Sequence, residues 1–397
     1  MKVLWLHNHY QVWGGESAAA GREARLLAAA GVEVHQEAAD NASIDAMGMV
    51  ERLALPLRNA WSRSSYRRVR ELCRSVRPDL VHAHNVWPLL SPAVFAAARA
   101  EGVPTVFTAH NFYLFCLNGV FFRDGRICTD CHGRTPWPGV LHRCYRGLAG
   151  SATRYLGAVL HRALGTFQSI DRILTPTEFA RQRFLEAGFS AGQVQAKWLS
   201  CEDPRAAAAG NPAPLPPPSA PTFLVACRLV PEKGVRVLIE AAGRSAVPWR
   251  LEVAGDGPER SDLTARATAL GLEPRVEFLG HLDPREVARR IDRATAVALP
   301  SLWFETFGLT AIEAFAAGRA VVASDLGALR EVVTGDSGLL VPAGDPSAWA
   351  AALDQLASDR ALAARLAAGA RARYELCFTP ERDAERLLAT YAAVVSR

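Results

Sequence analysis

Two glutamates stand eight positions apart around one glycine, and this spacing suits the binding of a single extended ligand. Glu305 and Glu313 flank Gly308 in SLWFETFGLTAIEAF, residues 301–315. The residues before it, 294–300, form a short apolar run that ends in proline, which is typical of a buried strand. The residues after it carry apolar side chains at helical spacing. The sequence therefore predicts a strand, a tight loop and the start of a helix.

The predicted start of this helix offers unpaired N–H groups and the positive end of a dipole, which favour a phosphate. Gly308 allows the backbone to approach a ligand closely. Because eight helical residues rise by about 12 Å, the two carboxylates can hold hydroxyl groups at opposite ends of one ligand. A sugar joined through a diphosphate to a ribose has about that form. The alternative, a surface turn with two solvated glutamates, stays open on this stretch alone.

A second loop brings two cations to the end of another predicted strand. Arg228 and Lys233 lie five residues apart in CRLVPEKG, residues 227–234, ahead of a predicted helix. Two cations at the carboxyl end of a strand can bind a diphosphate leaving group. Lysine and arginine also commonly cover protein surfaces, so this loop alone does not separate a binding site from an ordinary surface.

Two glycine-containing turns are further candidates for close backbone approach to a ligand. In AGDGP, residues 254–258, Gly255 follows a predicted strand, and in WGGES, residues 13–17, Gly14 and Gly15 precede a predicted helix. The second turn resembles a phosphate-binding loop but matches neither the dinucleotide nor the P-loop pattern. The first is otherwise an ordinary turn.

Histidines end two predicted strands of the first half. His82 and His84 lie at the end of PDLVHAH, and His110 ends PTVFTAH. In open α/β sheets the carboxyl ends of the strands line the ligand-binding crevice, so these imidazoles are candidates for a site. A purely structural role is the alternative for each of them, and His110 is the strongest candidate of the three.

Apolar runs alternate with helical patterns along the whole chain, which predicts parallel α/β architecture. The pattern occurs twice, and the proline-rich segment 204–221 separates the two occurrences. We therefore expect two doubly wound domains that face a cleft. The first half carries an irregular insertion, 112–150, which is rich in cysteine, glycine, proline and aromatic residues.

The composition limits the classes of function. The chain has 397 residues, half of them hydrophobic, which is ample for two cores. No apolar run reaches the roughly 18–20 residues of a membrane span, and the N-terminus turns polar at His7, too early for a signal peptide. We expect a cytoplasmic protein. The net charge of +5 suits anionic ligands or an anionic membrane surface. No nucleic-acid-binding motif is present, so no nucleic-acid partner is expected.

Four cysteines in the insertion are spaced as metal ligands. Cys116, Cys128, Cys131 and Cys144 include one C-x2-C pair, and four thiolates with one close pair fit a tetrahedral structural zinc site. An iron–sulfur cluster, free cysteines and disulfides are the alternatives, and a cytoplasmic location disfavours disulfides. Zinc is the interpretation we prefer.

An arginine stripe is expected on a helix within residues 58–77. Its members recur at spacings of three and four, which places them on one helical face. The simplest interpretation is a solvated face, and the alternatives are weak attachment to anionic lipid or contact with an anionic acceptor. The stripe consists of Arg63, Arg67, Arg70, Arg74 and Arg77.

Taken together, these loops resemble the retaining GT-B glycosyltransferases of family four. The strongest part is the two-glutamate stretch, and beside it stand CRLVPEKG, VAGDGPE, FLGHL and the pair PDLVHAHN and FTAHNF. The resemblance covers almost the whole chain. It implies an acceptor-binding domain over 1–203 that contains the insertion, a linker over 204–221, a nucleotide-sugar-binding domain over 222–380, and a last helix, 381–397, that crosses back to the first domain.

The resemblance also implies roles for particular side chains. Arg228 and Lys233 are expected to neutralise the diphosphate of the donor. Glu313 is expected to hold the ribose hydroxyls and Glu305 the transferred sugar. His110 is expected to lie near the reacting centre and to bind the donor sugar.

Backbone groups complete the implied donor site. The helix start is expected to bind the diphosphate through N–H groups, the first-domain loop to close over it, and the FLGHL segment to read the base. The residues concerned are Phe307, Gly308, Leu309, Gly14, Gly15, Gly255, His281 and Leu282.

The implied reaction is transfer of a sugar from a UDP- or GDP-linked donor to a carbohydrate or lipid-linked acceptor, with retention at the anomeric carbon, in cell-surface glycan assembly. Family members need no metal for catalysis, because cationic side chains stabilise the leaving diphosphate. A peripheral position on the inner membrane face would suit a lipid-linked acceptor. The alternatives are a sugar-nucleotide epimerase on the same fold and a non-catalytic scaffold that binds sugar nucleotides.

Overall fold

A computed structural model describes residues 1–9, 15–133, 135–205, 215 and 218–396. The chain folds as two compact units. The first comprises Met1–Phe121, Cys128–Leu199 and Glu381–Arg397, and the second comprises Phe122–Ile127 and Ser200–Pro380. The first unit thus passes into the second at Leu199, ahead of the predicted domain end at residue 203. Much of the predicted linker, 206–214 and 216–217, lies outside the described residues.

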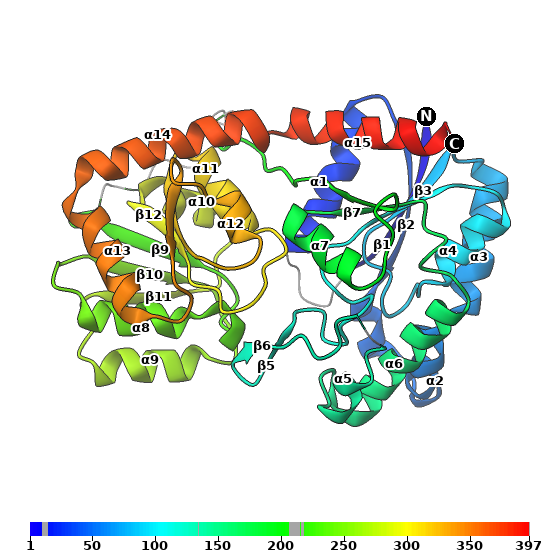
Figure 1. Ribbon diagram of the computed structural model, residues 1–397, viewed down its shortest axis with the longest axis horizontal. Helices are drawn as coiled ribbons and strands as arrows, with labels where there is room; N and C mark the ends of the chain where they lie inside the picture. The colour runs from blue at the N-terminus through cyan, green and yellow to red at the C-terminus, as the bar shows by residue number, and fades with distance from the viewer. Residues whose placement is uncertain (10–14, 134, 206–214, 216–217, 397) are drawn as a thin grey trace. The chain divides into compact units, whose positions relative to one another are not determined.

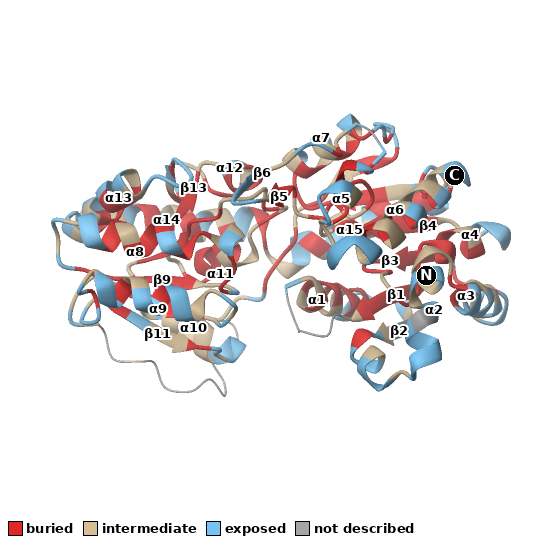
Figure 2. Cartoon of the chain, turned by 90° about the horizontal axis from the view of Figure 1, so that it is seen from below, coloured by how far each residue is buried: buried red, intermediate tan, exposed pale blue. Residues whose placement is uncertain are grey.

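Each unit is built on a six-stranded parallel sheet with helices on both faces (Figure 1). Short, wholly buried apolar strands such as AVAL and AVVAS explain this, because strands covered on both faces need no alternation of polar residues. The predicted α/β architecture with two doubly wound sheets is confirmed. Figure 2 shows the buried residues gathered on the strands and the exposed residues on the outer helix surfaces.

The first sheet has the strand order β2-β1-β3-β4-β7-β8. Its strands are β1 (Lys2–His9), β2 (Glu33–Asp40), β3 (Leu80–Ala83), β4 (Thr105–Thr108), β7 (Arg172–Thr175) and β8 (Val194–Ala196). The helices of this unit are α1 (Gly15–Ala29), α2 (Met49–Ala60), α3 (Arg63–Val76), α4 (Ala93–Ala100), α5 (Pro138–Leu141), α6 (Gly147–Ala163), α7 (Glu178–Glu186) and most of α15 (Pro380–Val395), with a 3-10 helix at Asn41–Ala46.

The second sheet has the strand order β11-β10-β9-β12-β13-β14. Its strands are β9 (Thr222–Ala226), β10 (Arg250–Ala254), β11 (Val276–Gly280), β12 (Ala296–Leu299), β13 (Ala320–Ser324) and β14 (Gly338–Val341). The helices are α8 (Val235–Arg244), α9 (Arg260–Ala269), α10 (Pro284–Arg293), α11 (Leu309–Ala316), α12 (Leu329–Val332), α13 (Pro346–Ser358) and α14 (Arg360–Cys377), with a 3-10 helix at Pro231–Lys233. A small hairpin pairs β5 (Phe122–Arg123) with β6 (Arg126–Ile127).

Each sheet has a point where the strand order reverses, and ligands of doubly wound sheets bind beside the carboxyl ends of the strands at that point. In the second sheet β9 and β12 are neighbours, although two strands separate them in the sequence. The loop with the two cations follows β9, and the loop with Glu305 follows β12. In the first sheet the reversal lies between β1 and β3. The fold thus brings together loops that lie far apart in the sequence.

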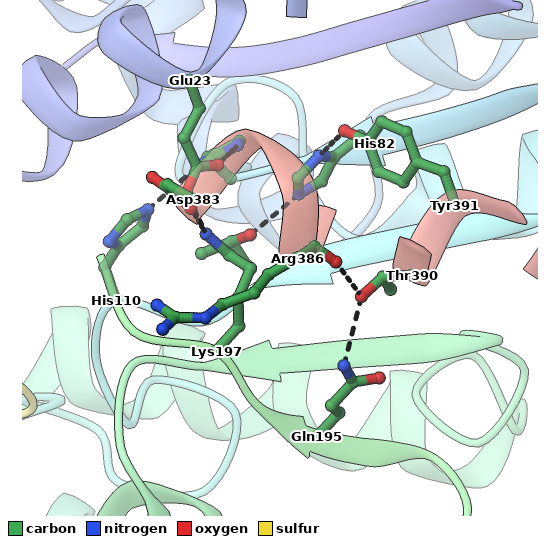
Figure 3. A network of polar contacts seen from close by, with 11 residues as sticks. Glu23, His82, His110, Gln195, Lys197, Asp383, Arg386, Thr390 and Tyr391 are labelled. Atoms are coloured by element: carbon green, nitrogen blue, oxygen red, sulfur yellow. Dashed lines mark hydrogen bonds and ion pairs between the residues drawn. The ribbon is translucent and has the colours of Figure 1, made fainter. Parts of the chain in front are cut away.

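Helix α15 is part of the first unit's core. Leu387, Tyr391 and Val394 pack in the same buried cluster as Val3 and Trp5 of β1. This packing continues beside a buried polar network, in which α15 supplies an acid and a phenol (Figure 3). The C-terminal residues are therefore fixed to the first unit by both apolar and ionic contacts.

At the centre of that network, the ammonium of Lys197 lies between two carboxylates. Its Nζ is 2.6 Å from Oε1 of Glu23 and 2.5 Å from Oδ1 of Asp383, and all three side chains are almost wholly buried. Removing one partner of a buried ion pair typically costs about 3–5 kcal/mol, because a charge is then left uncompensated. With two carboxylates on one ammonium, burial raises the pKa of Glu23 to about 7, against the opposing effect of Lys197.

Four arginines of the predicted stripe lie on α3, whereas Arg77 follows the helix as its C-cap with φ 52°, and part of the stripe is already engaged. Arg70 and Arg74 both donate to the carboxylate of Glu101, whereas Arg63 and Arg67 are exposed. No helix in the described residues is both long enough and apolar enough to cross a membrane.

Buried imidazoles make the stability of the first unit depend on pH. Burial is the main cause that lowers the pKa of His7 and His161 to about 4 and that of His110 to about 3, and it holds the pKa values of His82 and His84 well below the usual range. Between about pH 6.5 and pH 4 the unfolded chain therefore binds more protons than the folded chain at these groups. Their contribution to stability is present at neutral pH and is lost as the pH falls.

The free energy of unfolding should fall between about pH 7 and pH 5, and His161→Gln should reduce that fall by on the order of 1 kcal/mol. Glutamine can still donate to the carbonyl oxygen of Ala60, 2.6 Å from Nε2 of His161, but does not titrate. Chemical denaturation at the two pH values measures both effects. An unchanged pH dependence in the variant would show that His161 does not take part.

Candidate active site

The side chains of Lys233 and Glu305 form the central contact of the second unit's site. Nζ of Lys233 lies 2.7 Å from Oε1 of Glu305. The same oxygen accepts hydrogen bonds from the hydroxyl of Ser301 at 2.7 Å and the indole N–H of Trp303 at 2.9 Å. Three donors on one oxygen fix the carboxylate, and hydrogen bonds to ionised groups are the stronger kind. The sheet therefore holds a fixed ion pair where β9 and β12 end.

Lys233 keeps its charge in this position and stays partly accessible. Burial by itself lowers the pKa of the ammonium, but the charge and hydrogen bond of Glu305 outweigh burial and raise the pKa above its usual value. The side chain is 25% exposed, and Nζ also lies 5.0 Å from the ring centre of Trp303. One cation is thus both fixed and open to an anionic ligand.

Arg228 supplies a second cation on the same loop. Its side chain is 66% exposed, and its nearest carboxylate, Glu232, is 3.7 Å away. So loose and exposed a pair contributes little to stability. The guanidinium is therefore available to bind an anion at little cost.

Three glycines hold the loops after β9, β10 and β12 against one another. A Cβ on Gly234, where φ is 67°, would lie 2.1 Å from the carbonyl oxygen of Pro300. A Cβ on Gly255, where φ is 140°, would lie 1.9 Å from the carbonyl oxygen of Cys227, and one on Gly257 would lie 2.3 Å from that of Leu229. Gly255 is therefore required for loop packing, and its expected contact with a donor stays a prediction.

The start of α11 has the features expected of a phosphate-binding helix. Gly308 is the N-cap with φ 104°, and as a glycine it has no side chain to cap the first N–H groups. Phe307 is buried, and its ring lies 5.9 Å from that of Phe378, so the loop is anchored before the helix begins. Leu309 and Glu313 lie on the helix, both partly buried. The first N–H groups of such a helix are the kind of donors that bind an anion.

In the first unit, the histidines at the ends of β3 and β4 are joined to an acid on α1. Nδ1 of His84 lies 2.9 Å from Nε2 of His110, and Nε2 of His84 lies 3.5 Å from Oε2 of Glu23. Because the lowered pKa values keep both imidazoles neutral, one ring nitrogen of the 2.9 Å pair donates and the other accepts. The hydrogen bond to His84 therefore helps to set the orientation of His110.

The remaining predicted donor-binding residues lie in three places. Gly15 begins α1, and the next residue, Glu16, accepts a hydrogen bond from the amide of Asn111 at 3.2 Å. His281 is exposed and Leu282 is partly buried directly after β11. Gly14 lies outside the described residues.

Among the described residues, the side chains of Glu23, His82 and His84 are the one group of three whose ligand atoms all lie within 4.8 Å of one another. The contacts of this group are those of a structural network. The two ring nitrogens of His82 lie 2.5 Å from the hydroxyl of Tyr391 and 2.8 Å from that of Thr108. The ammonium of Lys197 occupies one oxygen of Glu23. These partners use both ring nitrogens of His82 and one oxygen of Glu23, whereas Nε2 of His84 and Oε2 of Glu23 are buried without a hydrogen-bond partner.

Comparison with known proteins decides the family. The model for the glycosyl transferase 4-like domain matches residues 14–196, and the model for glycosyl transferases group 1 matches residues 212–373. The chain belongs to this glycosyltransferase family. The two matches fall in the first and second halves of the chain.

Two relatives of this chain show the range of enzymes that are similar to it in sequence. Glycogen synthase from Mycobacterium tuberculosis is 31% identical over 306 residues, which are 76% of this chain and 65% of that enzyme. The chain thus spans less than two thirds of the length of that relative. D-inositol 3-phosphate glycosyltransferase from Xylanimonas cellulosilytica is 39% identical over 186 residues, 46% of this chain and 44% of the relative.

Solved structures show that the fold is GT-B, as predicted. HepE from Anabaena, solved in complex with UDP, matches with a TM-score of 0.71 at 18% identity and covers 99% of this chain and 100% of its own. Sucrose-phosphate synthase from Thermosynechococcus elongatus matches with a TM-score of 0.70 at 20% identity and covers 100% of both chains.

Several functional contacts were not predicted from the sequence. The pairing of Lys233 with Glu305 was not expected, because each had been given a separate role. Ser301 and Trp303 lie inside the stretch 301–315. Their hydroxyl and indole N–H are the signal from which they could have been predicted to donate to the carboxylate of Glu305. The partners of His110 had no such local signal.

Proposed function

We propose that the chain is a retaining glycosyltransferase that moves a hexose or related sugar from a nucleoside diphosphate to a carbohydrate or lipid-linked acceptor. Family membership supports the reaction class. HepE, also solved with UDP-glucose at a TM-score of 0.68, supports a uridine diphosphate donor, with a guanosine diphosphate donor as the alternative. Assembly of a cell-surface glycan is the pathway we infer.

The observation that carries the proposal is the partly exposed Lys233, held by Glu305 where β9 and β12 end. In the proposed step the bond from the anomeric carbon to the diphosphate oxygen breaks, and its electron pair goes to that oxygen. Lys233 and Arg228 stabilise the negative charge that develops there. The acceptor hydroxyl bonds to the anomeric carbon on the same face and gives its proton to the leaving phosphate.

The other site residues orient the donor in this proposal. The N–H groups at Phe307, Gly308 and Leu309 bind the diphosphate, and Glu313 accepts hydrogen bonds from the ribose hydroxyls. Glu305 holds the sugar through the carboxylate oxygen that Lys233 does not use. His110 binds a hydroxyl of the transferred sugar through a neutral ring.

Further proposed contacts involve the backbone. The segment at His281 and Leu282 contacts the base, and Gly15, together with Gly14 and Gly255, lets the loops approach the diphosphate. These roles extend the site to the ends of β1, β10 and β11.

A panel of nucleotide sugars tests the proposal against its two alternatives. The protein is incubated with each UDP- and GDP-linked sugar without acceptor, and released sugar, nucleotide and altered sugar nucleotide are measured. A glycosyltransferase should slowly hydrolyse one donor and release nucleoside diphosphate. Conversion of the donor to its epimer without release would indicate an epimerase, and binding without any turnover would indicate a scaffold.

Replacement of Lys233 tests whether its charge is needed for the proposed reaction. With the donor identified by the panel, Lys233→Ala should lower kcat by at least about a hundredfold, which is the scale for loss of one transition-state charge contact. Lys2→Ala is the matched control, because Lys2 is an exposed lysine at the start of β1. Near wild-type turnover in a folded Lys233→Ala variant would remove Lys233 from the mechanism.

We also infer weak association with an anionic membrane, which would suit a lipid-linked acceptor. The exposed arginines of α3 support it, and so does a row of exposed leucines on α6. Leu156 and Leu160 lie one turn apart on that helix, Leu164 is its C-cap, and the three are 62%, 37% and 54% exposed. Exposed apolar residues combined with cations are the composition of surfaces that bind membranes.

Vesicle sedimentation measures this association. Binding should rise with the content of anionic lipid and fall with salt, because each arginine near the surface contributes about 1 kcal/mol. The double variant Leu156→Ser, Leu160→Ser should bind less, and Leu376→Ser is the control, since Leu376 is 67% exposed in the second unit. Equal binding to neutral and anionic vesicles would refute the electrostatic part.

A further inference from the structure

The zinc site predicted in the insertion has no support in the structure. Among the described residues, no three of the sulfurs of Cys116, Cys128, Cys131 and Cys144 lie within 4.8 Å of one another. Sγ of Cys116 instead donates to Oδ1 of Asn118 at 3.0 Å. The residue of the first unit that points to a ligand is an arginine of α6.

Arg154 is a buried cation without an anionic partner. Among the lysines and arginines of the described residues, only Lys197 and Arg154 are buried, at 2% and 8% exposure. Lys197 lies between two carboxylates, whereas the side chain of Arg154 makes no ion pair and no hydrogen bond in the described part of the chain. Buried donors are normally paired, and an unpaired one calls for an explanation. The chain thus does not itself supply the partner that a buried guanidinium needs.

Three aromatic rings hold this guanidinium in place. Its Cζ lies 3.9 Å from the ring centre of Tyr113, 4.5 Å from that of Tyr145 and 5.5 Å from that of Trp87. Ring faces attract a cation and offset part of the cost of burying it. They do not accept the hydrogen bonds that its N–H groups direct in the plane of the guanidinium. None of its nitrogens is among the wholly enclosed polar atoms without a partner, so a small ligand group can reach them.

Helix α6 is fixed on both sides of Arg154. Oγ of Ser151, one turn earlier, accepts from the N–H of Tyr145 at 2.9 Å and donates to its carbonyl oxygen at 3.2 Å. One turn later, a Cβ on Gly157 would lie 3.4 Å from Cα of Ala60, so α6 lies close to the end of α2. The position of Arg154 is therefore set by the packing of the helix that carries it.

The rings over Arg154 come from the ends of two central strands. Trp87 follows β3 and Tyr113 follows β4, and the ends of the same strands carry His84 and His110. Ligands of doubly wound sheets bind beside the carboxyl ends of the strands. Arg154 therefore lies at the edge of the first sheet where a ligand of this unit is expected.

A narrow hollow lies beside the guanidinium, and Asn59, Trp87, Tyr113 and His161 also line it. About 10 Å³ of it is accessible to the centre of a water molecule, which is room for roughly one oxygen atom. Arg154 is the one charged side chain among the lining residues, because burial lowers the pKa of His161 to about 4 and keeps it neutral. Oδ1 of Asn59 is buried without a hydrogen-bond partner and can accept from a hydroxyl. The hollow therefore suits an oxyanion that has a hydroxyl group nearby.

We propose that Arg154 binds a carboxylate of the acceptor, which is then an acidic sugar. The site belongs to the proposed sugar transfer, on which this inference rests, and it narrows the class of the acceptor. A carboxylate is flat and accepts two parallel hydrogen bonds in the plane of a guanidinium, which is the direction that the stacked rings leave open. Its single negative charge matches the single cation, whereas a phosphate group is tetrahedral and carries close to two charges.

Binding of three sugars to the full chain, without a donor, tests the proposal. Ligand-observed NMR gives the affinities for glucuronate, glucose 6-phosphate and glucose. Glucuronate should bind at least roughly tenfold more tightly than glucose, which is the scale of one hydrogen bond to a charged group. Arg154→Gln should lose most of that preference. Arg67→Gln is the matched control and should keep it, because Arg67 is an exposed arginine of the same unit.

Three results would overturn the proposal. They are equal affinities for glucuronate and glucose in the wild type, an unchanged preference in a folded Arg154→Gln variant, and a preference for glucose 6-phosphate over glucuronate that Arg154→Gln abolishes. The first comparison needs no variant. If Arg154→Gln does not fold, Arg154→Lys keeps a cation against the rings but loses the paired N–H groups, so it should bind glucuronate severalfold more weakly. An unchanged affinity in Arg154→Lys would contradict the paired contact.

The same measurements separate this site from the reaction. A preference for glucuronate that depends on Arg154, in a protein that transfers no sugar from any donor, would support the site and contradict the proposed function. Sugar transfer by a protein that lacks this preference would support the proposed function and contradict the site.

Discussion

The ion pair between Lys233 and Glu305 is the contact on which the rest of the proposed donor site depends. One carboxylate oxygen receives the ammonium, a hydroxyl and an indole N–H, so the loops after β9 and β12 cannot move independently. The cation keeps its charge because the carboxylate compensates for burial. Both side chains lie where the strand order reverses, at the ends of β9 and β12. A neutral residue in place of Lys233 or Glu305 would remove the contact that positions the other side chain, as well as one charge.

The first unit holds its histidines neutral beside a buried group of three charged side chains. Lys197 places one ammonium between two buried carboxylates, one on α1 and one on α15, and the neighbouring histidines remain uncharged because burial lowers their pKa values. His84, which lies beside Glu23, hydrogen-bonds to His110 and helps to set its orientation. A neutral imidazole can donate or accept a hydrogen bond from a sugar hydroxyl without adding a charge. The C-terminal helix thus takes part in this buried network through Asp383 and Tyr391.

The sequence predicted what depends on local pattern. Short apolar runs predicted the strands, and Gly308, Arg228 and Lys233 were recognised because turn and charge patterns lie within a few residues of one another. Contacts between distant residues could not be predicted in this way. Lys233 and Glu305 are 72 positions apart in the sequence, and Lys197 and Asp383 are 186 apart. Contacts over such separations leave no mark on the spacing of apolar and polar residues from which helices and strands are predicted. The pairing of Arg70 and Arg74 with Glu101 was missed for the same reason, since a helical stripe shows which side chains share a face and not what they meet.

The central claim is that the fixed cation of the second unit binds a diphosphate, and calorimetric titration of the protein with UDP and with uridine tests it most directly. Charged hydrogen bonds contribute about 1.5–3 kcal/mol, so UDP should bind wild-type protein at least roughly tenfold more tightly than uridine. In Lys233→Ala most of that difference should disappear, while uridine should bind as before. Equal affinities for UDP and uridine in the wild type, or an unchanged preference for UDP in a folded Lys233→Ala variant, would contradict the account.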